Sequence, residues 1–135
     1  MTLSAITGKN SYCGPAAVAT IAGITTDEAA KHIRKAYNRK SIRRVYPEEL
    51  VHALTELGYT ANYMEFPLAR RPTLAKWLRG REDRNKMTIV FLTGHFATVK
   101  GNKYIDNHTK EPVWISKAPG RRKRVVGVIT VEEIE

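Results

Sequence analysis

The sequence is poor in cysteine: Cys13 is the only one, so no disulfide can form within the chain. Neither Cys13 nor the histidines have the spacing of zinc ligands, and no metal or cofactor site is predicted. Long hydrophobic runs are also missing, because residues 16–24 and 87–92 fall well short of the roughly 20 residues that span a bilayer. The N-terminus lacks the basic and apolar segments of a signal peptide. We therefore expect a cytoplasmic protein without a membrane span.

Acidic residues are scarce as well. The chain has 13 Asp and Glu against 23 Lys and Arg, which gives a formal net charge of +10. This excess favours an acidic partner, such as nucleic acid, anionic lipid or an acidic protein. Basic runs occur at 39–44 and 121–124, but no aromatic residues are interleaved with them, so contact with nucleic acid is expected to be non-specific. Such runs are most often solvated faces, and the sequence does not indicate an oligomeric state.

What the sequence does contain is typical of a folded protein. Its 42% hydrophobic and 27% charged residues match the composition of ordinary globular domains. A length of 135 residues is close to the commonest domain size, and no repeat or low-complexity linker divides it. We therefore predict one domain, residues 1–135.

Cap and turn signals divide this domain into a helical and a β-rich half. Three helices are expected first: one from Cys13 that stops at Gly23, one over 25–37 behind a capping box, and one over 47–57. A short strand over 59–66 and a short helix over 73–79 follow. Short β-branched or aromatic segments then predict strands at 87–92, 96–99, 103–105, 112–115 and 124–130. Helices followed by antiparallel strands predict an α+β fold.

Cys13 lies at the start of the first predicted helix. The positive end of the helix dipole and the unpaired amides there lower the pKa of a thiol from about 8.5 toward roughly 3.5–7.5. Small residues follow it in Gly14-Pro15-Ala16, so a substrate can approach closely, and the amide of Cys13 itself is a candidate donor to an oxyanion. A buried structural cysteine is the alternative interpretation.

His95 is the candidate base. It follows the strand at 87–92 across a Thr-Gly turn and itself opens the next strand, so the ring is expected at a strand edge. Asp106 and Asn107 come at the end of the strand after that, where a neighbouring antiparallel strand delivers either side chain to His95. One of them is expected to fix the tautomer of the ring. His108, next in the turn, is predicted to be a surface residue.

This arrangement resembles the papain-like cysteine peptidases, in particular their double-glycine, or bacteriocin-processing, branch. The likeness is carried by Asn10-Ser-Tyr-Cys13-Gly-Pro-Ala-Ala, by the two helices that follow, and by His95 and Asp106 in that order. It implies a papain-like fold in which N-terminal helices, with the nucleophile at a helix N-terminus, pack on a C-terminal antiparallel sheet. It also implies that Cys13 is the nucleophile, His95 the base and Asp106 the orienting residue, with Asn107 as the alternative for the last role.

The sequence departs from the pattern of this family in two places. The family has an oxyanion-hole glutamine six residues before the cysteine, where this chain has Thr7. Asn10 is the nearest side-chain amide, so either Asn10 or main-chain amides alone would complete the hole. The usual Asp-Pro is replaced by Asp106-Asn107, which leaves the choice of third residue open.

The predicted activity is attack by the Cys13 thiolate on a peptide, isopeptide or related amide carbonyl, followed by release of the acyl-enzyme. Water in the second step makes the enzyme a hydrolase and an amine makes it a transferase; the sequence does not separate the two. The expected substrate is an extended peptide tail, with an acidic one favoured by the charge. The alternative is a catalytically inactive papain-like binding module that uses its basic surface to hold an acidic protein or nucleic acid, an interpretation that Thr7 supports.

Overall fold

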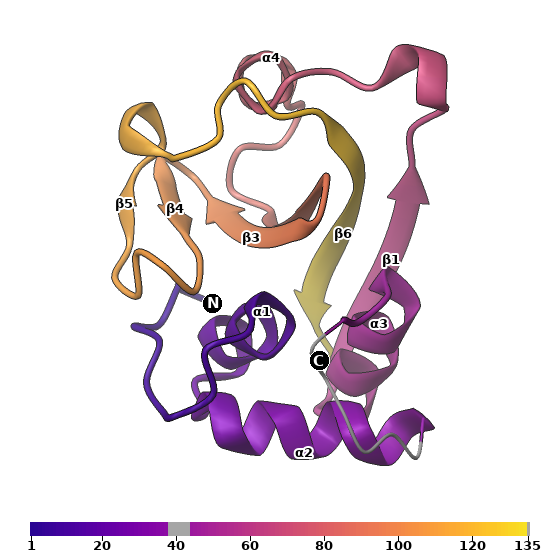
Figure 1. The fold of residues 1–135 in the computed structure, drawn as a ribbon, viewed down its shortest axis with the longest axis vertical. Helices are drawn as coiled ribbons and strands as arrows, with labels where there is room; N and C mark the ends of the chain where they lie inside the picture. The colour runs from indigo at the N-terminus through magenta and orange to yellow at the C-terminus, as the bar shows by residue number, and fades with distance from the viewer. Residues whose placement is uncertain (38–43, 135) are drawn as a thin grey trace.

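The computed structural model describes residues 1–37 and 44–134, and Figure 1 traces the order of its elements. The helices are α1 (Cys13–Ala22), α2 (Thr26–Tyr37), α3 (Pro47–Glu56) and α4 (Leu74–Gly80), with 3-10 turns η1 (Leu68–Arg70) and η2 (Ile115–Lys117). The strands are β1 (Tyr59–Glu65), β2 (Met87–Leu92), β3 (His95–Lys100), β4 (Lys103–Ile105), β5 (Val113–Trp114) and β6 (Val125–Glu133). The predicted basic run at 39–44 lies outside the described residues except for Arg44. None of the helices in the described part is both long and apolar enough to cross a bilayer.

All six strands form one sheet in the order β1-β6-β2-β3-β4-β5, and every pair is antiparallel. The α+β prediction is therefore confirmed. The sheet is not purely C-terminal, however, because β1 joins it along β6, from Tyr59 opposite Glu133 to Glu65 opposite Gly127. Figure 1 shows the two strands running side by side at one edge of the sheet.

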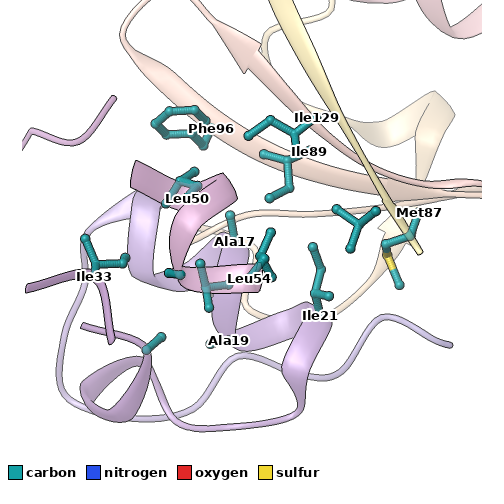
Figure 2. Packing of buried hydrophobic residues seen from close by; sticks show 14 of the residues in the cluster. Ala17, Ala19, Ile21, Ile33, Leu50, Leu54, Met87, Ile89, Phe96 and Ile129 are labelled. Atoms are coloured by element: carbon teal, nitrogen blue, oxygen red, sulfur yellow. The ribbon is translucent and has the colours of Figure 1, made fainter. Parts of the chain in front are cut away.

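The first helices cover one face of the sheet. Residues of α1, α2 and α3 form a buried cluster with the sheet, which Figure 2 shows at Leu50, Leu54, Ile89, Phe96 and Ile129. Leu50 and Leu54 are completely buried, and each such leucine contributes about 1.5–3 kcal/mol through removal of apolar surface from water. The other face carries a second cluster around α4. This double cover explains why β2 is apolar almost throughout rather than alternating: neighbouring residues of that strand enter opposite clusters.

Helix α1 is the element that positions the candidate nucleophile. Every residue from Gly14 to Ile21 is buried, because the helix lies between the sheet and the other two helices. Gly23 ends it in a left-handed conformation at φ 69°, as the sequence predicts. Gly14 is required by close packing, since a Cβ atom there would lie 2.4 Å from Cγ2 of Val45. The start of α1 is thus fixed on all sides.

Candidate active site

The Cys13 thiol is half-buried at the N-terminus of α1. Tyr12, the N-cap, has extended backbone and makes no side-chain cap, so no side chain of the N-cap competes for the first amides of the helix. Burial by itself disfavours the thiolate. Hydrogen bonds with the His95 side chain, the main-chain amide of Phe96 and the amide of Cys13 itself outweigh that penalty, and the pKa of Cys13 lies below its ordinary value. The site therefore favours a nucleophilic thiolate.

The His95 imidazole connects the thiol to the sheet. His95 begins β3 opposite Leu92 of β2, directly after a turn in which Gly94 has φ 73°. Its Nε2 lies 3.1 Å from Oδ2 of Asp106, which leaves Nδ1 for the hydrogen bond with Cys13. Burial disfavours the imidazolium, but the hydrogen bonds with Asp106 and Cys13 favour it more strongly and raise the pKa of His95 to about 9. A raised pKa of His95 and a lowered pKa of Cys13 both favour a proton on the imidazole rather than on the thiol, which is the state of a thiolate–imidazolium pair.

The Asp106 carboxylate lies directly after β4 and is 1% exposed. Its Oδ2 accepts from the Tyr104 hydroxyl at 2.6 Å as well as from His95. Its Oδ1 accepts from the main-chain amides of His108 and Thr109, both at 2.8 Å. Burial raises the pKa of Asp106, but these four hydrogen bonds lower it more, and the net pKa is far below the ordinary range. The carboxylate is therefore charged and held in one orientation.

Asn107 points elsewhere. Its Nδ2 donates to the carbonyl of Ser11 at 2.9 Å, which ties the turn after β4 to the loop that leads into Cys13. Its Oδ1 is buried and has no partner within the described residues. Of the two candidates left open by the sequence, Asp106 is thus the one in contact with His95.

Asn10 and Thr7 belong to the segment before α1. Oδ1 of Asn10 accepts from the amide of Tyr12 at 3.0 Å, so this side chain bonds within its own loop. Thr7 is exposed, and its carbonyl accepts from the amide of Thr26 at 2.8 Å, which fastens the segment to α2. Among the hydrogen bonds of the described residues, none joins either side chain to Cys13. The main-chain amides of Phe96 and of Cys13 itself both lie within hydrogen-bonding reach of the Cys13 sulfur, so both are candidate donors to an oxyanion.

Two side chains at the site were not predicted from the sequence. Tyr104 is completely buried and holds Asp106; it precedes Asp106 by two residues, so strand periodicity places both on one face, a signal that was available. His108 is exposed, as predicted, but its ring also stacks on that of His95 with centroids 5.7 Å apart. The strand register that brings these two histidines together was not readable from the sequence.

A cleft of about 450 Å³ opens beside the thiol and the imidazole. Its described walls are mostly small or apolar, and among the lining residues that the structure describes Arg44 is the one charged side chain apart from the candidate catalytic pair. Tyr46 stands at the cleft with 70% of its surface exposed. The remaining lining residues are Gly14, Val45, Phe91, Gly94 and Phe96. Concave, mostly apolar hollows of this size are typical of ligand-binding sites.

Comparison with known proteins adds a finding about the fold. No protein-family model matches the sequence, and no curated protein matches it either. Solved structures do match. One is the peptidase domain of Streptococcus ComA, a bi-functional ABC transporter involved in a quorum sensing pathway, with a TM-score of 0.61 over 99% of this chain and 100% of that one, at 15% identity. Another is a double glycine motif protease from an AMS/PCAT transporter, in complex with the leader peptide, with a TM-score of 0.60 over 99% and 93% of the two chains, at 12% identity.

The chain has the fold of these peptidase domains. The papain-like architecture implied by the sequence resemblance is therefore confirmed, and the match extends over nearly the whole chain. At identities of 15% and 12% the likeness concerns the fold. The chemistry of this chain has to be argued from its own residues.

Proposed function

We propose that residues 1–135 form a single cysteine peptidase domain in which Cys13 is the nucleophile, His95 the base and Asp106 the orienting residue. The observation that carries the proposal is the continuous line of contacts from the thiol through the imidazole to the buried carboxylate. Thiol, imidazole and carboxylate in that order are the parts that acyl transfer requires. The cleft beside them provides room for a peptide.

In the first step, the Cys13 sulfur attacks the scissile carbonyl carbon and a C–S bond forms. The carbonyl oxygen becomes an oxyanion, to which the amide of Cys13 donates. His95 then gives its proton to the leaving nitrogen, the C–N bond breaks, and an acyl-enzyme remains. In the second step, His95 takes a proton from water as the hydroxide adds to the thioester carbonyl. The C–S bond then breaks, the carboxylic acid product leaves, and the Cys13 thiolate and His95 imidazolium are regenerated.

Asp106 acts on the reaction through His95. Because its carboxylate holds Nε2, the ring keeps Nδ1 directed toward the thiol and the imidazolium is stabilised by a full negative charge. The weak point of the site is the oxyanion hole. Thr7 stands where the family has a glutamine, and one such donor is worth about 10²–10³ in rate. We therefore expect turnover well below that of a complete papain-like enzyme.

The proposal is tested with a peptide library digested by the wild type and by Cys13→Ala, with products identified by mass spectrometry. Peptides with two consecutive glycines belong in the library, because one of the structures with this fold is a double glycine motif protease. We expect cleavage products with the wild type and none with Cys13→Ala. Equal products from both proteins, or none from either together with an unreactive Cys13, would favour the inactive binding module.

A further inference from the structure

The positive charge of the chain is concentrated in two segments. Residues 66–81 and 112–124 hold ten Lys and Arg residues and no Asp or Glu, while the other 13 cations are matched by the 13 acidic residues of the chain. The formal net charge of +10 therefore resides in these two segments. Glu65, Glu82 and Glu111 border them in the sequence. We call their ten cationic side chains the basic surface.

Main-chain hydrogen bonds hold the two segments side by side. The amide of Leu74 donates to the carbonyl of Lys123, that of Ala75 to Arg121, and that of Val125 to Pro72. Figure 1 shows α4, η1 and the chain leading into β6 together at the end of the molecule opposite α2. The two cation-rich segments thus lie side by side, although 30 residues separate them in sequence.

The charges of the basic surface are not neutralised inside the protein. Within residues 1–37 and 44–134, no ion pair joins any of the ten to a carboxylate. Some are fixed by main-chain carbonyls instead: Arg121 donates to Ile115 at 2.7 Å and Arg124 to Arg71 at 3.1 Å. Crowding like charges in this way costs free energy, which an anionic ligand recovers. Arginines held in advance also lose little freedom when they bind a carboxylate.

The basic surface reaches the candidate active site. A hollow of about 80 Å³ is lined on one side by His95, Asp106 and His108 and on the other by Gly120 and Lys123. His95 also lines the cleft that holds Cys13, so the two hollows share this residue. The Asp106 carboxylate, which would oppose an acidic ligand, is 1% exposed and is paired with the His95 imidazole, whose positive charge offsets it. Lys123 is therefore the residue of the basic surface that lines a hollow together with His95.

From this arrangement we propose that the basic surface binds an acidic stretch of the peptide substrate, on the side where the peptide leaves the cleft past His95. This inference rests on the proposed peptidase function and adds a substrate class to it. Single-stranded nucleic acid fits the surface less well, because its binding relies on exposed aromatic faces. Trp114 is the large exposed aromatic residue in the two segments, and the Lys103 ammonium already lies over its ring at 3.7 Å.

The test measures binding separately from catalysis. The protein is Cys13→Ala, and the probes are two fluorescein-labelled peptides of equal length, one with six consecutive glutamates and one with six glutamines. The test variant adds Lys117→Gln, Arg122→Gln and Lys123→Gln, three exposed side chains without hydrogen bonds within the described residues. The matched control adds Lys9→Gln, Lys31→Gln and Lys35→Gln, which remove the same charge elsewhere.

We expect the glutamate peptide to bind about tenfold more tightly than the glutamine peptide at low salt, and the preference to fall steeply with salt. The test variant should lose most of this preference for the glutamate peptide, and the control variant should keep the preference within about twofold of that of Cys13→Ala. In the wild type, the glutamate peptide should also slow alkylation of Cys13 by iodoacetamide, because the bound peptide crosses the cleft.

Equal affinity for both peptides would overturn the inference. So would binding without protection of Cys13, or binding of a single-stranded oligonucleotide where the glutamate peptide fails. Alkylation of Cys13 in the absence of any peptide tests the proposed function by itself. A reactive Cys13 with no peptide preference rejects only the acidic-substrate inference, whereas an unreactive Cys13 rejects the peptidase.

Discussion

The two carboxylate oxygens of Asp106 accept hydrogen bonds from different groups. One binds two main-chain amides of the following turn and fixes the side chain; the other receives the Tyr104 hydroxyl and His95. Burial would ordinarily make a carboxylate neutral. Here the donors keep it charged, and the charge is what raises the pKa of His95.

The charge of Asp106 is therefore expected to control the reactivity of Cys13. Asp106→Asn keeps the shape but removes the charge, so the pKa of His95 falls and the pKa of Cys13 rises. We expect alkylation of Cys13 by iodoacetamide at pH 6 to slow about tenfold or more, with Glu111→Gln as a charge-matched control that leaves the rate unchanged. An unchanged rate in Asp106→Asn would show that His95 does not depend on this carboxylate.

His95 is also expected to make stability depend on pH. Its pKa of about 9 in the folded protein lies above the unfolded value of about 6.5, so its contribution is complete below about pH 6.5 and is lost as pH rises through about 9. In urea unfolding, the stability gap between the wild type and His95→Gln should shrink by about 3 kcal/mol from pH 6 to pH 10. A gap that stays constant or grows would contradict the raised pKa.

At the scale of elements, the site depends on how closely α1 approaches the segment before α3. Gly14 is the point of contact, and its missing side chain leaves the space that Val45 fills. The same contact shapes the cleft, because both residues line it. The contact between Gly14 and Val45 therefore both positions the nucleophile and shapes the cleft.

Gly14→Ala should destabilise the protein by about 1–3 kcal/mol, because the new Cβ atom lies 2.4 Å from a branched side chain. The double variant with Val45→Ala should recover part of the loss, since the clash is removed. Gly80→Ala is the matched control: it is also helical, no atom lies within 4 Å of its added Cβ, and it should be neutral or slightly stabilising. Urea unfolding of the wild type and the three variants measures these stability changes. An unchanged free energy of unfolding in Gly14→Ala would mean that the contact with Val45 is not tight.

Local cap and turn signals in the sequence predicted most helices and strands, whereas features that depend on strand pairing were not predicted. Gly23 ended α1 where expected, and β4 was predicted at its observed bounds, because turns and caps are encoded in neighbouring residues. The position of β1 in the sheet was not predicted, since pairing with β6 joins segments about 70 residues apart. β6 also runs on to Glu133 instead of ending at residue 130, because β1 offers it partners as far as Tyr59.

In the candidate site, too, local signals could be predicted and long-range contacts could not. Cys13, His95 and Asp106 could be proposed because each stands at a recognisable helix start or strand end. The stacking of His108 on His95 and the approach of Val45 to Gly14 could not be assigned, because each depends on contacts across elements. The contact of Tyr104 with Asp106 could have been predicted, because the two residues are two positions apart. The basic segment at 66–81 was likewise not predicted: the sequence shows residues 121–124 as a basic run, but α4 lies beside them only in the folded chain.

For the whole molecule, the central feature is that the site is assembled from both halves of the chain. The helical half contributes the thiol and the β-rich half contributes the imidazole and the carboxylate. The two halves meet where the start of α1 packs against β3 (Figure 1). Neither half holds an activated thiol by itself, so the reactivity of Cys13 reports on the assembled fold.

The central claim is that His95 activates Cys13, and the pH dependence of Cys13 alkylation by iodoacetamide tests it most directly. In the wild type, fast alkylation should persist below pH 7, because the thiolate is paired with an imidazolium. In His95→Ala, alkylation should be slow and titrate at or above about pH 8.5, while His32→Ala, a histidine on α2, should resemble the wild type. Slow alkylation that titrates near 8.5 in wild type and His95→Ala alike would contradict the account.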